Sequence, residues 1–97
     1  MNRLYVFFDK LAGCVVGHGV HLFKHDAAAI RFFGDVASDP KTSIAKHVKD
    51  YQLLFVGAMD EQGSIELPES GLPQLILDGE KWLLSQPSAE STPTVVR

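Results

Sequence analysis

The stretch DYQLLFVGAMDEQGSIELP, Asp50 to Pro68, decides the fold of this chain. Residues 51–59 form a run that is apolar on both faces of a strand, because side chains alternate sides with a period of two. The two rows are Tyr51, Leu53, Phe55, Gly57 and Met59, and Gln52, Leu54, Val56 and Ala58. A turn at DEQG follows, since Gly63 can adopt positive φ without steric cost. The segment therefore predicts a β-hairpin whose second strand, 64–68, points Ile65 and Leu67 inward.

Upstream of the hairpin, the sequence predicts two strands and a helix. The run RLYVFF (3–8) is rich in β-branched and aromatic residues, and VHLFK (20–24) is expected to pair back on it across a glycine-rich loop. Within AAAIRFFGDVAS (27–38), the apolar residues Ala29, Phe32, Phe33 and Val36 recur at i, i+3, i+4 and i+7, which predicts an amphipathic helix. Asp26 can cap its first turn, and the helix should end before Pro40. The following segment, 41–49, is expected to be a loop or a single short turn.

Downstream of the hairpin, the sequence predicts a last helix that begins at Pro73. Its apolar stripe would contain Leu72, Leu75, Ile76 and Leu83, widened by Trp82 and Leu84. Gly79 would weaken the middle of this helix by up to about 1 kcal/mol. Residues 1–85 are expected to form one domain, and 86–97 a disordered polar tail.

These elements predict an α+β fold: a small antiparallel sheet of about four strands, in β-β-α-β-β-α order, covered on one face by two helices. Two helices can shelter only one face of such a sheet. The other face would expose Tyr5, Phe7 and one row of the Tyr51–Met59 strand. An apolar patch of a few hundred Å² is unusual on a monomer, so this face is expected to bind a partner.

Composition limits the possible classes of protein. The chain has 97 residues, of which 45% are hydrophobic, enough for one two-layer core. Its apolar runs are far shorter than the roughly 20 residues that cross a bilayer, and no signal peptide opens the sequence. The single cysteine, Cys14, has no partner for an internal disulfide. These features predict a protein of a reducing cytoplasm that has no contact with a membrane.

Charge is distributed unevenly along the chain. The net charge is −3, but residues 1–50 hold seven Lys or Arg against five Asp or Glu, whereas residues 51–97 hold two against seven. Such asymmetry is typical of a basic binding face, or of two faces that attract each other in a homo-oligomer. It is equally compatible with a solvated surface on which the charges are segregated by chance.

Two segments resemble a known viral family. The helix segment contributes Ala29, Arg31 and Phe33, and the hairpin contributes Asp50, Tyr51, Leu53, Gly57, Asp60 and Gly63, with Asp9 upstream. This pattern resembles the small nonstructural protein of gokushoviruses, microviruses with circular single-stranded DNA genomes. The resemblance covers roughly residues 3–68, and Met59 stands where that family tends to have phenylalanine. It implies a protein that corresponds to the microvirus DNA-packaging protein and acts on single-stranded viral DNA in the cytoplasm of the infected bacterium.

Binding of single-stranded DNA needs cations that follow the phosphates and flat side chains on which bases stack. The candidate cations are Lys10, Lys24, Arg31, Lys41, Lys46 and Lys49. The candidate stacking residues are Tyr5, Phe7 and Tyr51, provided that their face is open. The competing interpretation places these three aromatics in the core and pairs Arg31 with Asp35 at i+4 on the helix surface.

The sequence predicts neither a metal site, a cofactor nor an enzyme. Cys14, His18, His21 and His25 lie close together in the chain, but their spacing matches no zinc module. Cys14 has His18 nearby in sequence but no third group to orient it, and no glycine loop has the spacing that cradles phosphate.

Two hypotheses therefore remain. The first is a phage protein that binds single-stranded DNA as a homo-oligomer, a dimer joined through its apolar sheet faces. Viral capsid or replication proteins are further partners in this hypothesis. The second is a non-enzymatic homo-oligomeric interaction protein that holds a viral or host protein on its open sheet face. Salt separates them, because only DNA binding weakens steeply as ionic strength rises.

Overall fold

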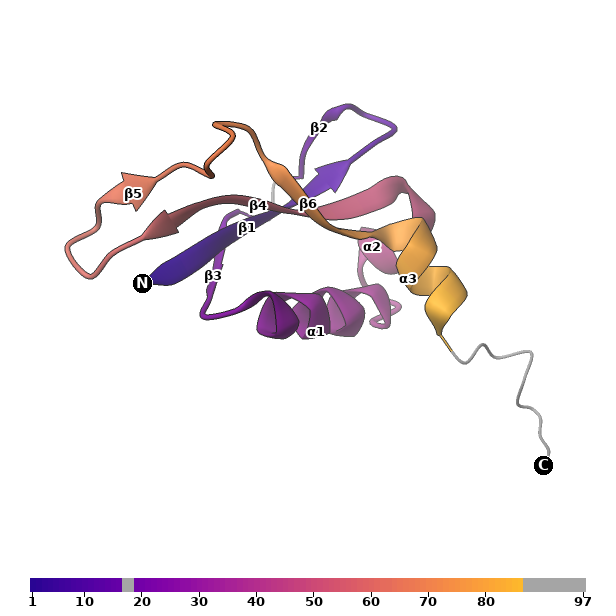
Figure 1. Cartoon of the computed structure of the whole chain (residues 1–97). Coiled ribbons are helices and arrows are strands. Elements are labelled where there is room, and N and C mark those ends of the chain that lie inside the picture. Colours follow the sequence, from indigo (N-terminus) through magenta and orange to yellow (C-terminus); the bar gives the residue numbers. More distant parts are fainter. Residues whose placement is uncertain (17–18, 87–97) are drawn as a thin grey trace.

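A computed structural model describes residues 1–16 and 19–86, which form one antiparallel sheet and its helices (Figure 1). The elements in chain order are β1 (Asn2–Asp9), β2 (Cys14–Val15), β3 (His21–Phe23), α1 (Asp26–Ala37), α2 (Ser43–Lys46), the 3₁₀ turn η1 (Val48–Asp50), β4 (Tyr51–Met59), β5 (Ile65–Glu66), β6 (Gln74–Asp78) and α3 (Gly79–Ser85). The predicted α+β class with an antiparallel sheet is confirmed, although the sheet has six strands where about four were predicted.

The two long strands, β1 and β4, form the centre of the sheet. They pair antiparallel from Asn2 opposite Met59 to Asp9 opposite Tyr51. The other edge of β1 pairs with β3 at one end and with β2 at the opposite end. The other edge of β4 likewise pairs with β5 and with β6. Both outer edges of the sheet are therefore made of short strands, an arrangement that limits edge-to-edge aggregation.

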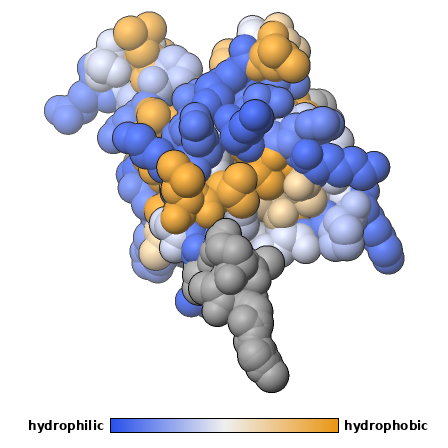
Figure 2. Space-filling view, turned by 90° about the vertical axis from the view of Figure 1, so that its right-hand side faces the viewer, coloured by the Kyte–Doolittle hydropathy of each residue, from blue (hydrophilic) through white to orange (hydrophobic). Residues whose placement is uncertain are grey.

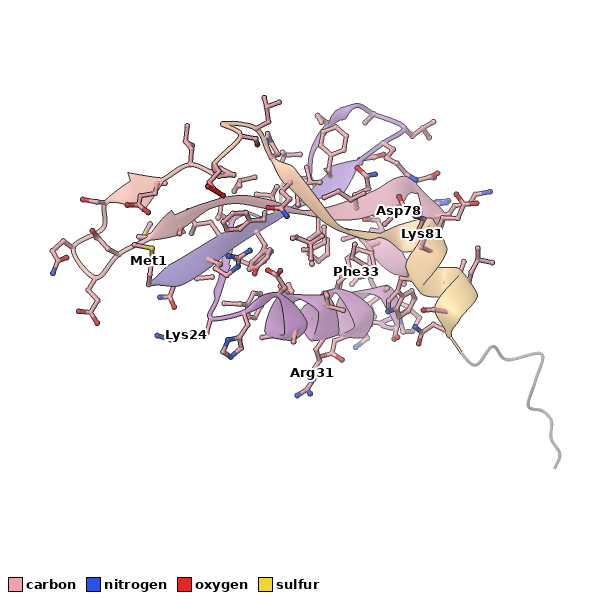
Figure 3. The ribbon with its side chains drawn as sticks, viewed as in Figure 1. Met1, Lys24, Arg31, Phe33, Asp78 and Lys81 are labelled. Carbon is pink, nitrogen blue, oxygen red and sulfur yellow. The ribbon has the colours of Figure 1, made fainter. Side chains whose placement is uncertain are left out.

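The core lies between the sheet and the helix layer, by which we mean α1, α2, η1 and the connections that join them. α1 runs beneath the sheet, and Phe33 points from it toward the strands (Figures 1 and 3). Phe33 and Leu53 are both fully buried. The buried cluster comprises Tyr5, Phe7, Ala29, Phe33, Ala37, Ile44, Val48, Tyr51, Leu53 and Phe55.

The prediction that Tyr5 and Phe7 lie on the open face of the sheet is wrong. Tyr5 pairs with Phe55 and Phe7 with Leu53, and residues opposite each other in an antiparallel ladder share a face. Because Leu53 and Phe55 face the helix layer, the two aromatic residues of β1 do so as well. The alternate row of β1, Leu4, Val6 and Phe8, therefore lies on the open face.

The predicted helix from Pro73 to Leu84 is wrong over its first half. Gln74–Asp78 instead forms β6 against β4, and α3 begins at Gly79. Asp78 ends the strand and caps the helix, because its side chain accepts a hydrogen bond from the Lys81 N–H. Pairing along β4 overrides the helical spacing of Leu72, Leu75 and Ile76, as tertiary context commonly does with local propensity.

Other boundaries follow the prediction more closely. α1 agrees with the predicted run to within one residue at each end, but its N-cap is His25 and the Asp26 carboxylate binds elsewhere. Gly63 has the expected positive φ, at 90°. The second strand of the hairpin is only two residues long, and Ile65 and Leu67 are 57% and 69% exposed, so the prediction that they point inward is wrong. The predicted tail, apart from Gln86, lies outside the described residues.

Candidate nucleic-acid interface

Five of the six predicted cations lie on the helix layer or at its start. These helix-layer cations are Lys24, Arg31, Lys41, Lys46 and Lys49, and all five are exposed. Lys24 follows β3, Arg31 lies on α1, and the other three lie between the end of α1 and the start of β4. Figure 3 shows Lys24 and Arg31 pointing away from the sheet. Within the described chain, the ion pairs are formed by other cations, Arg3 and Lys10.

The connection that carries Lys41 is held by short-range hydrogen bonds. The Asp39 carboxylate accepts the Lys41 N–H at 3.0 Å. Thr42 caps α2 by accepting the Ala45 N–H at 3.0 Å, and its hydroxyl donates to the Val36 carbonyl at 2.9 Å. These contacts fix the backbone between α1 and α2, so Lys41 and Lys46 project from an ordered surface.

Lys10 differs from the helix-layer cations because it has a carboxylate partner, although its backbone N–H donates to the Asp50 carbonyl of η1 at 2.8 Å. Its Nζ lies 2.9 Å from Oδ1 of Asp78, at the junction of β6 and α3. Partial burial raises the pKa of Asp78, but hydrogen bonds from Lys10 and Gln52 outweigh that effect, and the net pKa is lowered. Lys10 therefore joins the β1–β2 turn to the start of α3 and is already neutralised by a carboxylate.

The three predicted stacking residues are in the core. Tyr5, Phe7 and Tyr51 are 0%, 2% and 7% exposed. Their ring faces contact other side chains; Phe7, for example, lies 5.4 Å from Phe33 between ring centroids. The condition under which these residues were predicted to stack on bases is not met, because both long strands direct them under the helix layer.

One polar cluster was not predicted from the sequence. Oδ1 of Asp26 accepts hydrogen bonds from the Tyr5 hydroxyl at 2.5 Å and from Nε of Arg3 at 3.0 Å. Burial, together with the bond to Asp26, raises the pKa of Tyr5. The Arg3 guanidinium also lies 3.9 Å from the centroid of the Phe55 ring. This cluster ties the start of α1 to β1, and no local sequence signal could reveal it because Asp26 lies more than twenty residues from both partners.

The face of the sheet opposite α1 carries no helix of the described chain (Figure 1). Cross-strand pairing places these apolar residues on this open sheet face: Leu4, Val6, Phe8, Val15, Leu22, Leu54 and Leu75. It also places the hydrogen-bonded Gln52 and Asp78 at one end of the face. Leu4 and Val6 at its centre are nearly buried, whereas Val15, Leu22 and Leu75 at its rim are 50%, 45% and 52% exposed. An apolar sheet face does exist, as predicted, but a different row of β1 contributes to it.

Four of the seven acidic residues of the second half lie on a different part of the molecule. Asp60, Glu61, Glu66 and Glu69 belong to the β4–β5 hairpin and the connection to β6. Glu66 and Glu69 line a groove of about 670 Å³ between this connection and β4, together with Leu67 and Leu72. A groove with this charge does not suit a phosphate backbone.

A second apolar surface lies around α3. In Figure 2, hydrophobic side chains gather beside the start of the grey tail, below a hydrophilic region. α3 contributes Leu83 and Leu84, which are 48% and 80% exposed, whereas Trp82 packs inward against Phe33.

The described residues contain no group of three side chains suited to hold a metal ion, and His18 lies outside them. Cys14 is an exposed free thiol. Among the described helices, none is long and apolar enough to cross a membrane.

The family model described as "Phage ORF5 protein" matches residues 2–82, which include the whole sheet and the first half of α3. No curated protein and no solved structure matches the chain.

Proposed function

Because the chain belongs to the phage ORF5 protein family, we propose that it is a non-enzymatic protein that binds single-stranded viral DNA. It acts in replication or packaging of the phage genome, in the cytoplasm of the host bacterium. The resemblance to the gokushovirus nonstructural protein supports this finer assignment. The observation that carries the proposal is the set of five exposed helix-layer cations, which have no carboxylate partner in the described chain.

Within the described chain, the surface that carries the helix-layer cations suits a single strand of DNA best. They lie on contiguous segments of the helix layer, whereas four acidic residues lie on the hairpin and its connection to β6. A strand that follows the helix layer therefore avoids the main acidic region. Asp35, Asp39 and Asp50 lie in the same part of the sequence as the cations, so the local positive excess is small and one subunit should bind weakly.

A homodimer would raise the affinity. The open sheet face supports such a dimer, because exposed apolar side chains surround a nearly buried centre. When two such faces pack together, the two helix layers lie on opposite outer surfaces. Each dimer then offers two separate strand sites, and a long strand that occupies both gains affinity through effective concentration.

The experiment is a fluorescence-anisotropy titration of the protein with labelled oligo-dT at several salt concentrations. Binding is expected at low salt, with a log–log slope of about −0.7 for each phosphate contacted. The double variant Lys46→Glu, Lys49→Glu should weaken binding and make the slope shallower. The control is Gln62→Glu in the turn between β4 and β5, an exposed position at the opposite end of the sheet from η1 (Figure 1), which should leave binding nearly unchanged. Absence of binding by the unmodified protein at micromolar concentration contradicts the proposal.

The alternative function is a non-enzymatic interaction or assembly protein that binds a viral or host protein through the open sheet face. The apolar character of that face, and the burial of Tyr5, Phe7 and Tyr51, favour this candidate. It predicts a stable oligomer whose state and stability do not change when oligo-dT is added.

A further inference from the structure

A small pocket opens at the edge of the helix layer, between β3, α1 and the start of α2. Its volume is about 200 Å³, and its lining is almost entirely apolar. The lining residues are Phe7, His21, Phe32, Val36, Thr42 and Ile44. Phe32 and Val36 lie one turn apart on α1, so the same helix face forms one side of the pocket.

Aromatic rings dominate the pocket and its surroundings. The Phe32 ring lies 4.8 Å from His21, 5.4 Å from Phe23 and 5.9 Å from Phe7, between centroids. Phe7 is buried beneath the others, but His21, Phe23 and Phe32 are each half-buried. Part of this aromatic cluster therefore meets solvent, unlike the rings of Tyr5 and Tyr51.

Two helix-layer cations flank this cluster in the chain. Lys24 directly follows Phe23, and Lys41 directly precedes Thr42; both lysines are exposed. Lys24 precedes α1 and Lys41 follows it, so the two charges lie beyond opposite ends of this helix, whose face carries Phe32. A strand that runs along α1 could therefore place a base on the half-buried rings and more distant phosphates near either lysine. The Thr42 hydroxyl is already bonded to backbone groups of Val36, Asp39 and Ala45, so the pocket has little means of selecting one base over another.

We propose that this aromatic pocket takes one base of the bound strand, which stacks on Phe32 and His21 while Lys24 and Lys41 contact phosphates farther along the strand on either side of that base. The inference rests on the proposed function and deepens it. In this proposal the base stacks on Phe32 and His21, whereas the stacking residues predicted from the sequence, Tyr5, Phe7 and Tyr51, belong to the core. Stacking in such sites tolerates any base, because every base has a π face.

The test compares oligo-dT with an abasic oligonucleotide of equal length, which has the same phosphates but no bases. The unmodified protein should prefer oligo-dT by about fivefold or more, the lower end of the stacking contribution of one base. Phe32→Leu keeps an apolar side chain but removes the flat ring. This variant should bind oligo-dT as weakly as the abasic strand, whose own affinity should not change.

The matched control is Phe8→Leu, the same change in a half-buried ring on the opposite face of the sheet. It should keep the preference for oligo-dT. Equal binding of both oligonucleotides by the unmodified protein overturns the pocket but leaves the proposed function standing. Binding of neither oligonucleotide overturns both. Because the comparison on the unmodified protein is decisive, the test does not depend on the folding of a variant, which circular dichroism checks separately.

Discussion

At the scale of single residues, Asp26 has the position of a helix-capping residue but binds other partners. An aspartate at the start of a helix commonly caps it, and Asp26 does lie in the first turn of α1. Its carboxylate instead accepts hydrogen bonds from Tyr5 and Arg3 on β1. The carboxylate oxygen that could have accepted a backbone N–H of the first turn of α1 is therefore bonded to β1. This tertiary contact anchors α1 beneath the sheet.

This contact predicts a modest loss of stability for Tyr5→Phe. The variant removes the hydroxyl but keeps the ring in the core, and Asp26 retains Arg3 as a partner. The free energy of unfolding should fall by about 1 kcal/mol, the usual net contribution of one hydrogen bond. Urea denaturation followed by circular dichroism measures it. A variant as stable as the unmodified protein contradicts this role for the hydroxyl.

Tyr5 also predicts that the stability of the fold depends on pH. The pKa of Tyr5 is raised, so the folded state favours the neutral phenol. The resulting stability is fully present below the ordinary tyrosine pKa of about 10 and is lost as the pH rises through the folded-state value. Unfolding curves on either side of pH 10 should therefore show an alkaline loss of stability that is smaller in Tyr5→Phe.

At the scale of elements, the junction between β6 and α3 depends on close backbone packing. A side chain on Gly79 would place its Cβ 1.9 Å from the Val48 carbonyl oxygen and 2.6 Å from that of Tyr51. Only glycine fits at this approach of α3 to η1. The position that was expected to weaken the middle of a helix is in fact the first residue of α3, where the lack of a side chain permits the contact.

Gly79→Ala should therefore destabilise the protein strongly. The neighbouring atoms belong to the backbone and cannot move without shifting η1 or α3, so a loss of more than about 2 kcal/mol is expected. The matched control is Gly34→Ala in α1, where the nearest atom is Nε1 of the Trp82 side chain at 3.4 Å. Thermal unfolding of both variants measures the difference, and equal midpoints would contradict the packing argument.

At the scale of the whole molecule, the two faces of the sheet differ in what covers them. One is covered by the helix layer, and the other carries an apolar centre with an exposed rim. Lys24 and Arg31 point away from the sheet on the side of α1 (Figure 3), and the other helix-layer cations belong to the same layer. The same subunit can therefore pair through one face and bind a polyanion on the other.

A charge placed on the open sheet face should disrupt the proposed dimer. Leu22 is 45% exposed, so Leu22→Glu should be tolerated within one subunit but not in an apolar interface. Sedimentation velocity should show the unmodified protein as a dimer and this variant as a monomer. Leu84→Glu, at an 80% exposed position on α3, is the control that should remain dimeric. An unmodified protein that sediments as a monomer at all concentrations contradicts the dimer.

The sequence by itself determined the elements whose signals are local. The helix at 26–37, the long strand at 51–59 and the turn at Gly63 follow from periodicity and glycine conformation, which act over a few neighbouring residues. Only the tertiary structure decided which row of β1 faces the helix layer, because both rows are apolar and pairing with β4 alone sets the choice. It also decided that 74–78 is a strand, since the edge of β4 supplies its hydrogen-bond partners from a distant part of the chain.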